Sequence, residues 1–238
     1  MNGHFEMEAL AVVHSPYREK FGIPRQPGLV REAVCVIQML PPFNNPSAFV
    51  GIDEYSHLWI SFVFHGIEQT GWKPMVRPPR LGGNHKVGVF ATRSTYRPNQ
   101  MGLSVVELLE VRVENNEVFL HVAGADLLDG TPVLDIKPYI PYADNIPEAR
   151  SGLAPDRPDI LKVVFESTAA DLVADGGRLS ESRAMIEGVL AQDPRPAYHA
   201  GGNPDRVYGV CLEDYDVRFT VEGDIICVHE IIFQESND

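Results

Sequence analysis

Short apolar or alternating runs dominate about the first 140 residues of this 238-residue chain. The runs have the length of strands, are rich in Val, Ile and Phe, and are mostly bounded by Gly, Pro, Asn or Asp. No helical period longer than two turns competes with them. We therefore expect strands over 9–13, 34–40, 56–64, 87–91, 104–113, 118–122 and 132–136.

Several of these runs are close to one another in sequence, which limits the possible folds. The turn Glu114-Asn115-Asn116-Glu117 lies between two alternating runs and predicts a hairpin. Several short strands that are close in sequence favour an antiparallel or mixed barrel or sandwich over βαβ units. No Gly-x-Gly-x-x-Gly lies between a strand and a helix, so the common nucleotide-binding scaffold is excluded. A mainly β first domain follows.

The pattern changes after a stretch, 144–159, that holds three prolines and few apolar residues. Beyond it we expect a strand, a helix capped by Ser180 or Ser182, and closing strands. The helix is predicted from apolar residues that share one helical face. These elements span 160–165, 180–192, 207–212, 217–221 and 225–233. The chain is thus predicted to hold a β-barrel-like domain over 5–145, a linker over 146–159 and a small α+β domain over 160–238.

Composition and the number of cysteines indicate the class of protein and its cellular compartment. The chain is 44% apolar and 22% charged, which is an ordinary globular balance. It has no run of about 18 apolar residues, so we expect no membrane span, and its N-terminus lacks the features of a signal peptide. Cys35, Cys211 and Cys227 stand at no metal-binding spacing. We expect free thiols and a cytoplasmic protein.

Charge is segregated along the chain. The formal net charge is −13, which taken alone argues against a nucleic-acid partner. Residues 69–106, which we call the cationic island, carry +6 and no acid, whereas 1–68 carry −3 and 107–238 carry −16. Such an island is a focused target for an anion, unless its side chains pair with acids elsewhere in the fold. Its basic residues are Lys73, Arg77, Arg80, Lys86, Arg93 and Arg97.

The composition of the cationic island favours a nucleic-acid ligand. Arginine predominates, and its planar fork suits phosphate or carboxylate groups. Trp72 and Tyr96 stand among the arginines, as on surfaces that stack single-stranded bases.

Three further polar clusters carry candidate chemistry. Prolines 16, 24 and 27 fix a loop that presents Arg25 and Gln26 and suits a polar ligand. His57 and His65 flank an apolar strand, but no acid or cysteine stands at ligand spacing, so we expect no metal site. The third cluster offers a general base or a partner for a ribose hydroxyl, from Asp126, Asp129 and Asp135.

These clusters, in this order, resemble the TrmO (TsaA-like, YaeB-like) family of tRNA methyltransferases. The resemblance spans about 5–142 and resumes at 191–198. It is carried by Ser-Pro-Tyr-Arg-Glu-Lys-Phe at 15–21, Pro-Arg-Gln-Pro-Gly at 24–28, Ser-His-Leu-Trp-Ile at 56–60, Arg-Pro-Pro-Arg-Leu-Gly-Gly at 77–83, Gly-Val-Phe-Ala-Thr-Arg-Ser at 88–94, Asp-Gly-Thr-Pro-Val-Leu-Asp-Ile-Lys-Pro-Tyr at 129–139 and Ala-Gln-Asp-Pro-Arg-Pro-Ala-Tyr at 191–198.

The resemblance implies a β-barrel domain that binds S-adenosylmethionine, a small C-terminal domain and a homodimer. It also implies methylation of N6 of N6-threonylcarbamoyladenosine at position 37, beside the anticodon of threonine tRNA. Two other hypotheses stay open: a non-catalytic module that binds RNA or an anionic metabolite, and a metal-dependent hydrolase that uses the histidines and aspartates.

The resemblance also implies positions for the site. Gly66 departs from the usual Gln of the family, and Gln100-Met101 departs from the usual Pro-Ile. The proton acceptor stays open among His65, Asp129 and Asp135. Cofactor contacts are expected at Pro24, Arg25, Gln26, His65, Gly66, Arg93, Leu103, Leu128, Asp129, Gly130 and Thr131. RNA contacts are expected at Arg77, Arg80, Lys86, Tyr96, Arg97 and Arg195.

Overall fold

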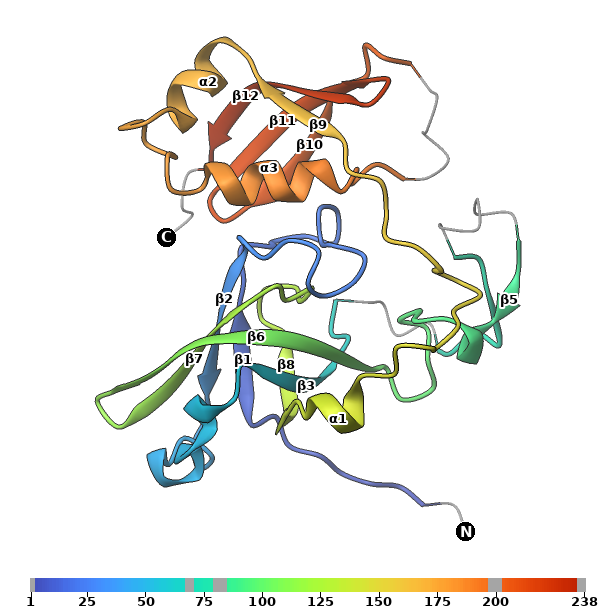
Figure 1. Ribbon diagram of the computed structural model, residues 1–238, viewed down its shortest axis with the longest axis vertical. Helices are drawn as coiled ribbons and strands as arrows, with labels where there is room; N and C mark the ends of the chain where they lie inside the picture. Colours follow the sequence, from blue (N-terminus) through green and yellow to red (C-terminus); the bar gives the residue numbers. More distant parts are fainter. Residues whose placement is uncertain (1–2, 67–70, 79–84, 197–202, 235–238) are drawn as a thin grey trace.

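Six strands from the first part of the chain close into a barrel, in the order β1-β2-β7-β6-β3-β8 (Figure 1). The computed structural model describes residues 3–66, 71–78, 85–196 and 203–234. All barrel pairings are antiparallel. The predicted mainly β first part is therefore confirmed as a closed barrel. Its strands are β1 (Ala11–His14), β2 (Val34–Met39), β3 (His57–Val63), β6 (Met101–Glu114), β7 (Glu117–Ala123) and β8 (Pro132–Pro138).

The alternation along the strands fills the barrel. In β3 every second residue is buried, so Leu58, Ile60 and Phe62 point inward. The predicted hairpin joins β6 to β7, and both of its asparagines have positive φ, 49° at Asn115 and 66° at Asn116. Positive φ at both central residues is what a tight hairpin turn requires, and asparagine tolerates it.

The strand predicted over 87–91 is only partly correct. Val87–Gly88 forms β5 and pairs with β4 (Met75–Val76), but the chain then turns into the 3-10 helix Val89–Ala91. The turn forms because the Val89 carbonyl accepts from the Thr92 amide at 3.1 Å. Local hydrogen bonds thus override the apolar pattern. Other short helices are Pro46–Phe49, Ile52–Glu54 and α1 (Pro141–Asp144).

The C-terminal part is the predicted small α+β unit. Its sheet has the order β10-β11-β12-β9, with β9 parallel to β12. The predicted helix is present as α3; Ser182 is its N-cap residue but makes no capping hydrogen bond through its side chain. A further helix, α2, had not been expected. The elements are β9 (Lys162–Phe165), α2 (Ser167–Val173), α3 (Arg183–Ala191), β10 (Tyr208–Leu212), β11 (Tyr215–Glu222) and β12 (Ile225–Phe233).

The segment 15–33 leaves the barrel after β1 and enters the hydrophobic core of the C-terminal unit. Tyr17, only 1% exposed, lies in that core together with Val30 and Ala33. The backbone continues the contact, because Tyr17 forms an isolated β-bridge with Leu212. We call residues 15–33 the shared segment, since it connects two barrel strands but places Tyr17, Val30 and Ala33 in the core of the other unit.

Polar contacts secure the shared segment at its start. The Glu213 amide donates to the Pro16 carbonyl at 2.7 Å, and the Cys211 amide donates to Glu19 Oε1 at 2.8 Å. Arg18 Nε donates to the Glu213 carbonyl at 3.1 Å. The edge strand β10 and the turn after it therefore hold the backbone just before the Pro-Arg-Gln motif.

Two expectations about the chain as a whole can be compared with the structure. Cys35, Cys211 and Cys227 are free thiols, as predicted. Among the described residues, no helix has the length and apolar character needed to cross a membrane.

Gly22 offers a test of the contact between the two units. Its φ is +97°, and an added Cβ would lie 2.3 Å from Cγ2 of the buried Val210 in β10. Overpacking costs about 1–3 kcal/mol and a left-handed backbone adds about 1–2 kcal/mol. We expect Gly22→Ala to lower the free energy of unfolding, measured by urea denaturation, by about 2–5 kcal/mol from these two costs.

Gly28→Ala is the matched control. Gly28 also has positive φ (+76°), but a Cβ added there would meet nothing within 4 Å, so only the backbone cost applies. Equal losses of stability in the two variants would contradict a tight contact between the shared segment and β10.

Candidate functional site

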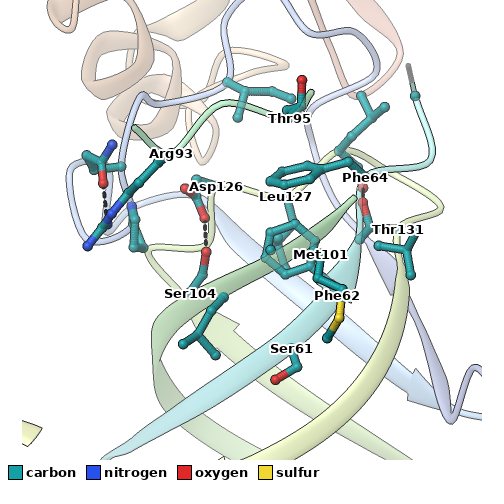
Figure 2. Close-up of a pocket in the computed structure, with 18 of the residues that line it drawn as sticks. Ser61, Phe62, Phe64, Arg93, Thr95, Met101, Ser104, Asp126, Leu127 and Thr131 are labelled. Atoms are coloured by element: carbon teal, nitrogen blue, oxygen red, sulfur yellow. Dashed lines mark hydrogen bonds between the residues drawn. The ribbon is translucent and has the colours of Figure 1, made fainter. Parts of the chain in front are cut away.

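A cavity of about 800 Å³ opens beside β3 and β6, under the loops that carry the sequence motifs (Figure 2). This volume lies in the range of about 300–1,000 Å³ typical of sites for small molecules. The shared segment contributes Lys20 and residues 23–27, and the loop after β7 contributes 126–128. The cationic island contributes residues between 92 and 97 from its loop and 101–105 from β6. Segments that are far apart in sequence thus meet at one site.

One wall of the cavity is apolar and aromatic. Phe62 and Phe64 pack edge to face with ring centroids 5.1 Å apart, and Met101 lies beside them in the lining. Gly102 leaves room for this packing, because a Cβ there would lie 2.2 Å from Phe62 Cζ. The wall suits the flat face of a ligand ring or an alkyl chain.

A polar pair joins two of the motifs at the cavity. Arg93 Nη1 donates to Gln26 Oε1, so the cationic island and the Pro-Arg-Gln loop are hydrogen-bonded to each other. Arg25 lies in the same lining, and its Nη2 donates to the Asp193 carbonyl of the C-terminal unit at 3.4 Å. The guanidinium groups of Arg25 and Arg93 therefore border the cavity, where an anionic part of a ligand would be stabilised.

A half-buried carboxylate faces the cavity from another side. Asp126, in the loop after β7, accepts a hydrogen bond from Ser104 Oγ of β6 at 2.6 Å (Figure 2). Burial raises the pKa of Asp126 because it disfavours the charged form; the hydrogen bond from Ser104, a hydrogen bond from the backbone of Asp126 itself and the positive charge of Arg93 oppose this rise.

Most of the expected cofactor residues lie together in the cavity lining. His65 is exposed at the rim, where β3 has ended. Gly66 brings Leu128 close, since a Cβ at position 66 would lie 2.7 Å from Leu128 Cδ2. The lining includes Pro24, Arg25, Gln26, His65, Gly66, Arg93, Leu103, Leu128 and Thr131.

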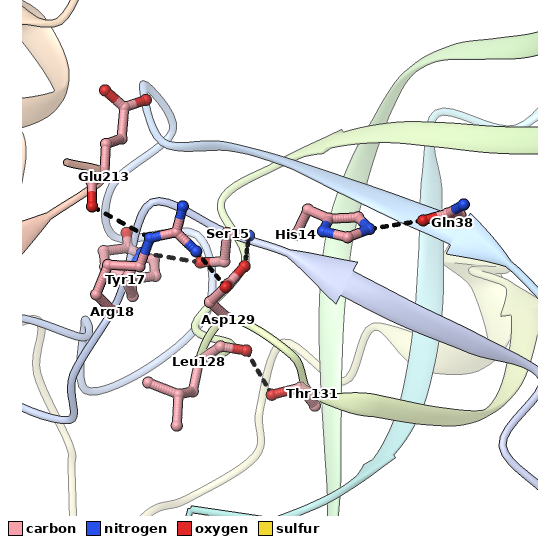
Figure 3. A network of polar contacts seen from close by, with 9 residues as sticks. All are labelled: His14, Ser15, Tyr17, Arg18, Gln38, Leu128, Asp129, Thr131 and Glu213. Carbon is pink, nitrogen blue, oxygen red and sulfur yellow. Dashed lines mark hydrogen bonds and ion pairs between the residues drawn. The ribbon is translucent and has the colours of Figure 1, made fainter. Parts of the chain in front are cut away.

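Asp129 and Gly130 are not part of this lining. Asp129 turns toward the shared segment, where its Oδ1 accepts from the Ser15 amide at 2.9 Å and its Oδ2 pairs with Arg18 (Figure 3). Both carboxylate oxygens are therefore engaged. Asp129 is placed to hold the start of the shared segment against the loop after β7.

Asp135 lies on β8, also outside the cavity lining. It pairs with Lys137 Nζ at 3.1 Å, and its Oδ1 accepts from the Ile136 amide at 3.0 Å. Of the three aspartates in the motif, only Asp126 faces the cavity. The sequence pattern offered Asp126 together with the other two as a general base, whereas the narrower set of proton acceptors implied by the family named Asp129 and Asp135 with His65 and left Asp126 out.

The residues expected to contact RNA differ in where the structure places them. Arg77 and Lys86 are exposed, and Arg80 lies outside the described residues. Arg97 lines the cavity and donates to the Thr92 carbonyl at 2.8 Å, so it also supports the turn at 89–92. Lys73 Nζ lies over the ring of Tyr96, 4.3 Å from the ring centroid.

The last of the expected RNA contacts, Arg195, forms an ion pair with Asp193 at 2.8 Å. The carbonyl of Asp193 also accepts from Arg25, so Asp193 links Arg195 to the Pro-Arg-Gln loop. A smaller cavity of about 200 Å³ separates this corner of the C-terminal unit from residues 20–25.

The hypothesis of a metal-dependent hydrolase requires a group of side chains that can bind a metal ion. Within the described ranges, no three His, Cys, Asp or Glu side chains are grouped so that they could hold a metal ion. His57 instead accepts or donates a hydrogen bond with Ser56 Oγ at 2.9 Å and lies near the ring of Tyr139.

Comparison with known families decides the relationship. The chain matches the tRNA-methyltransferase O N-terminal domain over 12–145 and the TrmO C-terminal domain over 158–234. The chain belongs to the tRNA-methyltransferase O family. The family predicted from the motifs is thereby confirmed.

Relatives are similar over nearly the whole chain. The tRNA (adenine(37)-N6)-methyltransferase of Escherichia coli K12 is 47% identical over 219 residues, which cover 91% of this chain and 93% of the relative. A putative S-adenosylmethionine-dependent methyltransferase, RcsF, of Pseudomonas aeruginosa is 47% identical over 213 residues, 88% of this chain and 90% of that protein. The crystal structure of TrmO from Pseudomonas aeruginosa superposes with a TM-score of 0.78 at 39% identity, covering 96% of this chain and 98% of that one.

Sequence reasoning missed Ser104 and the aromatic wall of this tRNA-methyltransferase O family site. The alternation of β6 could have indicated Ser104, because it stands two residues before the apolar Val106 and therefore on the same face of the strand. In the structure this face points inward, and Ser104 is 2% exposed. A hydroxyl at an inward strand position needs a partner, and Asp126 provides it.

The aspartates suggest a paired test. Asp129→Ala leaves the buried Ser15 amide without its acceptor and Arg18 without its partner, which costs about 1–3 kcal/mol. We expect lower stability in thermal unfolding and weaker binding of S-adenosylmethionine in calorimetry, because the shared segment loses its attachment to the loop after β7.

Asp135→Ala is the control. It removes a surface ion pair worth about 0–1 kcal/mol, and we expect near wild-type stability and affinity. A larger loss of affinity in Asp135→Ala than in Asp129→Ala would contradict the assignment of Asp129 to loop positioning.

Proposed function

We propose that this chain is an S-adenosylmethionine-dependent tRNA methyltransferase that methylates N6 of adenosine 37. We further propose that the adenosine carries an N6-threonylcarbamoyl group and that the substrate is threonine tRNA. The observation that carries the proposal is the hydrogen-bonded Gln26–Arg93 pair at a cavity of about 800 Å³, in a chain related over nearly its full length to tRNA methyltransferases.

The residues of the cavity fit the cofactor. S-adenosylmethionine carries an anionic carboxylate, a cationic sulfonium and an adenine ring. Arg25 and Arg93 provide positive charge for the carboxylate, while Phe62 and Phe64 provide an aromatic wall. The cavity therefore has a complementary group for each part of the cofactor.

Positioning accounts for much of the catalysis that this chain supplies. When bound, the cofactor supplies an electrophilic methyl group on sulfur. The hydrogen bond between Arg93 and Gln26 joins the cationic island to the Pro-Arg-Gln loop, so these two parts of the cavity lining are held together before a substrate binds. A fixed geometry converts the encounter of methyl group and nitrogen into an effectively unimolecular step.

Electrostatics support an RNA substrate. The cationic island carries +6 in a chain of net charge −13, and Arg77 and Lys86 are exposed on it. The backbone of RNA is anionic, and basic groups that contact phosphates release counterions on binding. The threonyl arm of the proposed nucleoside also carries a carboxylate, which gives the arginines near the cavity a second role.

We also propose that the protein acts as a homodimer in the cytoplasm. The support is the family relationship and the free thiols, which suit a reducing compartment. Sedimentation equilibrium of the purified protein tests the assembly; a monomer at micromolar concentration contradicts it.

A direct assay tests the function. Purified protein, labelled S-adenosylmethionine and threonine tRNA from cells that lack the gene are combined, and the nucleosides are analysed by mass spectrometry. We expect a gain of one methyl group on N6-threonylcarbamoyladenosine. Binding of tRNA with no methyl transfer would instead favour the non-catalytic module.

Arg93→Ala should abolish measurable binding of S-adenosylmethionine in calorimetry. The side chain is exposed and lies at the cavity, so its removal takes away a charged contact with little loss of stability. Arg112→Ala, which removes an exposed arginine from β6 outside the cavity lining, is the control. Wild-type affinity in Arg93→Ala would refute the assignment.

Arg77→Ala should weaken tRNA binding and reduce its salt dependence. If Arg77 neutralises one phosphate, the slope of log K against log salt becomes shallower by about 0.7–0.9. Arg112→Ala again serves as the control, because it lies outside the cationic island. An unchanged slope in Arg77→Ala would show that Arg77 does not contact the RNA backbone.

A further inference from the structure

Asp126 is a half-buried carboxylate in the cavity wall that no step described above uses. It stands three residues after the end of β7, and its Oδ1 accepts from Ser104 Oγ at 2.6 Å. The residues on both sides of it, Ala125 and Leu127, are fully or almost fully buried. A charged group in such a place is costly unless its interactions compensate. Its position at the cavity therefore calls for a functional explanation.

We propose that Asp126 is the catalytic base of this enzyme and that Ser104 is its positioning residue. The proposal rests on the function proposed above. In the reaction a bond forms between N6 of the adenine and the methyl carbon, while the bond from that carbon to sulfur breaks and its electron pair stays on sulfur. N6 loses its one hydrogen as a proton, and the Asp126 carboxylate accepts it.

The hydrogen bonds of Asp126 leave one oxygen for this task. Ser104 holds Oδ1, whereas Oδ2 has no side-chain donor among the hydrogen bonds of the described residues. The backbone of Asp126 also stabilises its carboxylate through a hydrogen bond. An oxygen that is fixed through its neighbour and has no side-chain donor is suited to accept a proton from a ligand in the cavity.

The other candidate acceptors are less well placed. Both oxygens of Asp129 are engaged, by the Ser15 amide and by Arg18. Asp135 lies outside the cavity lining and pairs with Lys137. His65 lines the cavity but is exposed at its rim, where water competes for the proton.

The surroundings of Asp126 favour a stronger base than an ordinary aspartate. Burial raises its pKa, and a general base is most effective when its pKa approaches the working pH. The groups that face it are Arg93, whose charge lowers the pKa, and two neutral groups with raised pKa values, Tyr17 and Cys35. Ser104 lowers the pKa of Asp126 by stabilising its charged form.

Asp126→Asn tests the assignment, because asparagine keeps the shape and can still accept from Ser104. We expect kcat to fall by about 10²–10⁴-fold, the usual contribution of a general base. Calorimetry without tRNA gives the second readout: the Kd for S-adenosylmethionine should change by no more than about threefold, because the group acts on the transition state. Asp135→Asn is the matched control and should leave both values unchanged.

The pH profile separates a base from a structural residue. The rate should rise with pH as Asp126 loses its proton. Ser104→Ala removes a hydrogen bond to the charged form, so the pKa of Asp126 rises further and the acid limb of kcat moves to higher pH. The same direction should appear in the carboxyl carbon shift of Asp126, followed by NMR titration of the protein alone.

Three outcomes would overturn the proposal: wild-type kcat in Asp126→Asn, a loss of S-adenosylmethionine affinity that accounts for the whole loss of rate, or an acid limb that Ser104→Ala leaves in place. Failure of the proposed function is distinguishable, because the wild-type protein would then transfer no methyl group to the tRNA at all. If Asp126→Asn does not fold, the Ser104→Ala profile and titration still decide the matter.

Discussion

The burial of the shared segment in the C-terminal core is the interaction on which the rest of the structure depends. Residues 15–33 connect β1 to β2 of the barrel, yet Tyr17 and Val30 are 1% exposed within the core of the other unit. Truncating a buried aromatic side chain costs about 3–5 kcal/mol, whereas an exposed ion pair such as Arg18–Asp129 contributes about 0–1 kcal/mol. Apolar packing therefore contributes most of the stability of the contact between the shared segment and the C-terminal unit, and the polar contacts orient the chain.

The consequence for the site is that the cofactor loop belongs to both units. The Pro-Arg-Gln motif lies between the parts of the shared segment that are anchored by Tyr17 and by Val30. The loop meets Arg93 from one side and Asp193 from the other. The C-terminal unit thus stabilises the geometry of a cavity whose lining comes from the N-terminal part of the chain.

Much of the fold could be predicted because it follows from local pattern. Alternation identified β3 and β7, and Asn115-Asn116 identified the hairpin, since both are properties of neighbouring residues. Helix α2 was missed because its seven residues are too few to show a helical period.

The candidate site could be predicted only as a set of motifs. The pairing of Gln26 with Arg93 depends on how two loops fold back over the barrel, which no local pattern encodes. Asp126 and Asp129 stand three residues apart in one loop, yet one faces the cavity and the other faces the shared segment. Such a choice depends on backbone geometry and not on residue type.

The C-terminal core holds the cofactor loop in place, and one variant tests this dependence most directly. Leu212 is fully buried in that core and bridges to Tyr17. In Leu212→Ala, amide hydrogen exchange should become faster in residues 17–30 together with β10 and β11, while β3 and β7 of the barrel keep their protection. The affinity for S-adenosylmethionine should fall in the same variant. Faster exchange in β10 and β11 with unchanged protection of residues 17–30 and unchanged affinity would contradict the account.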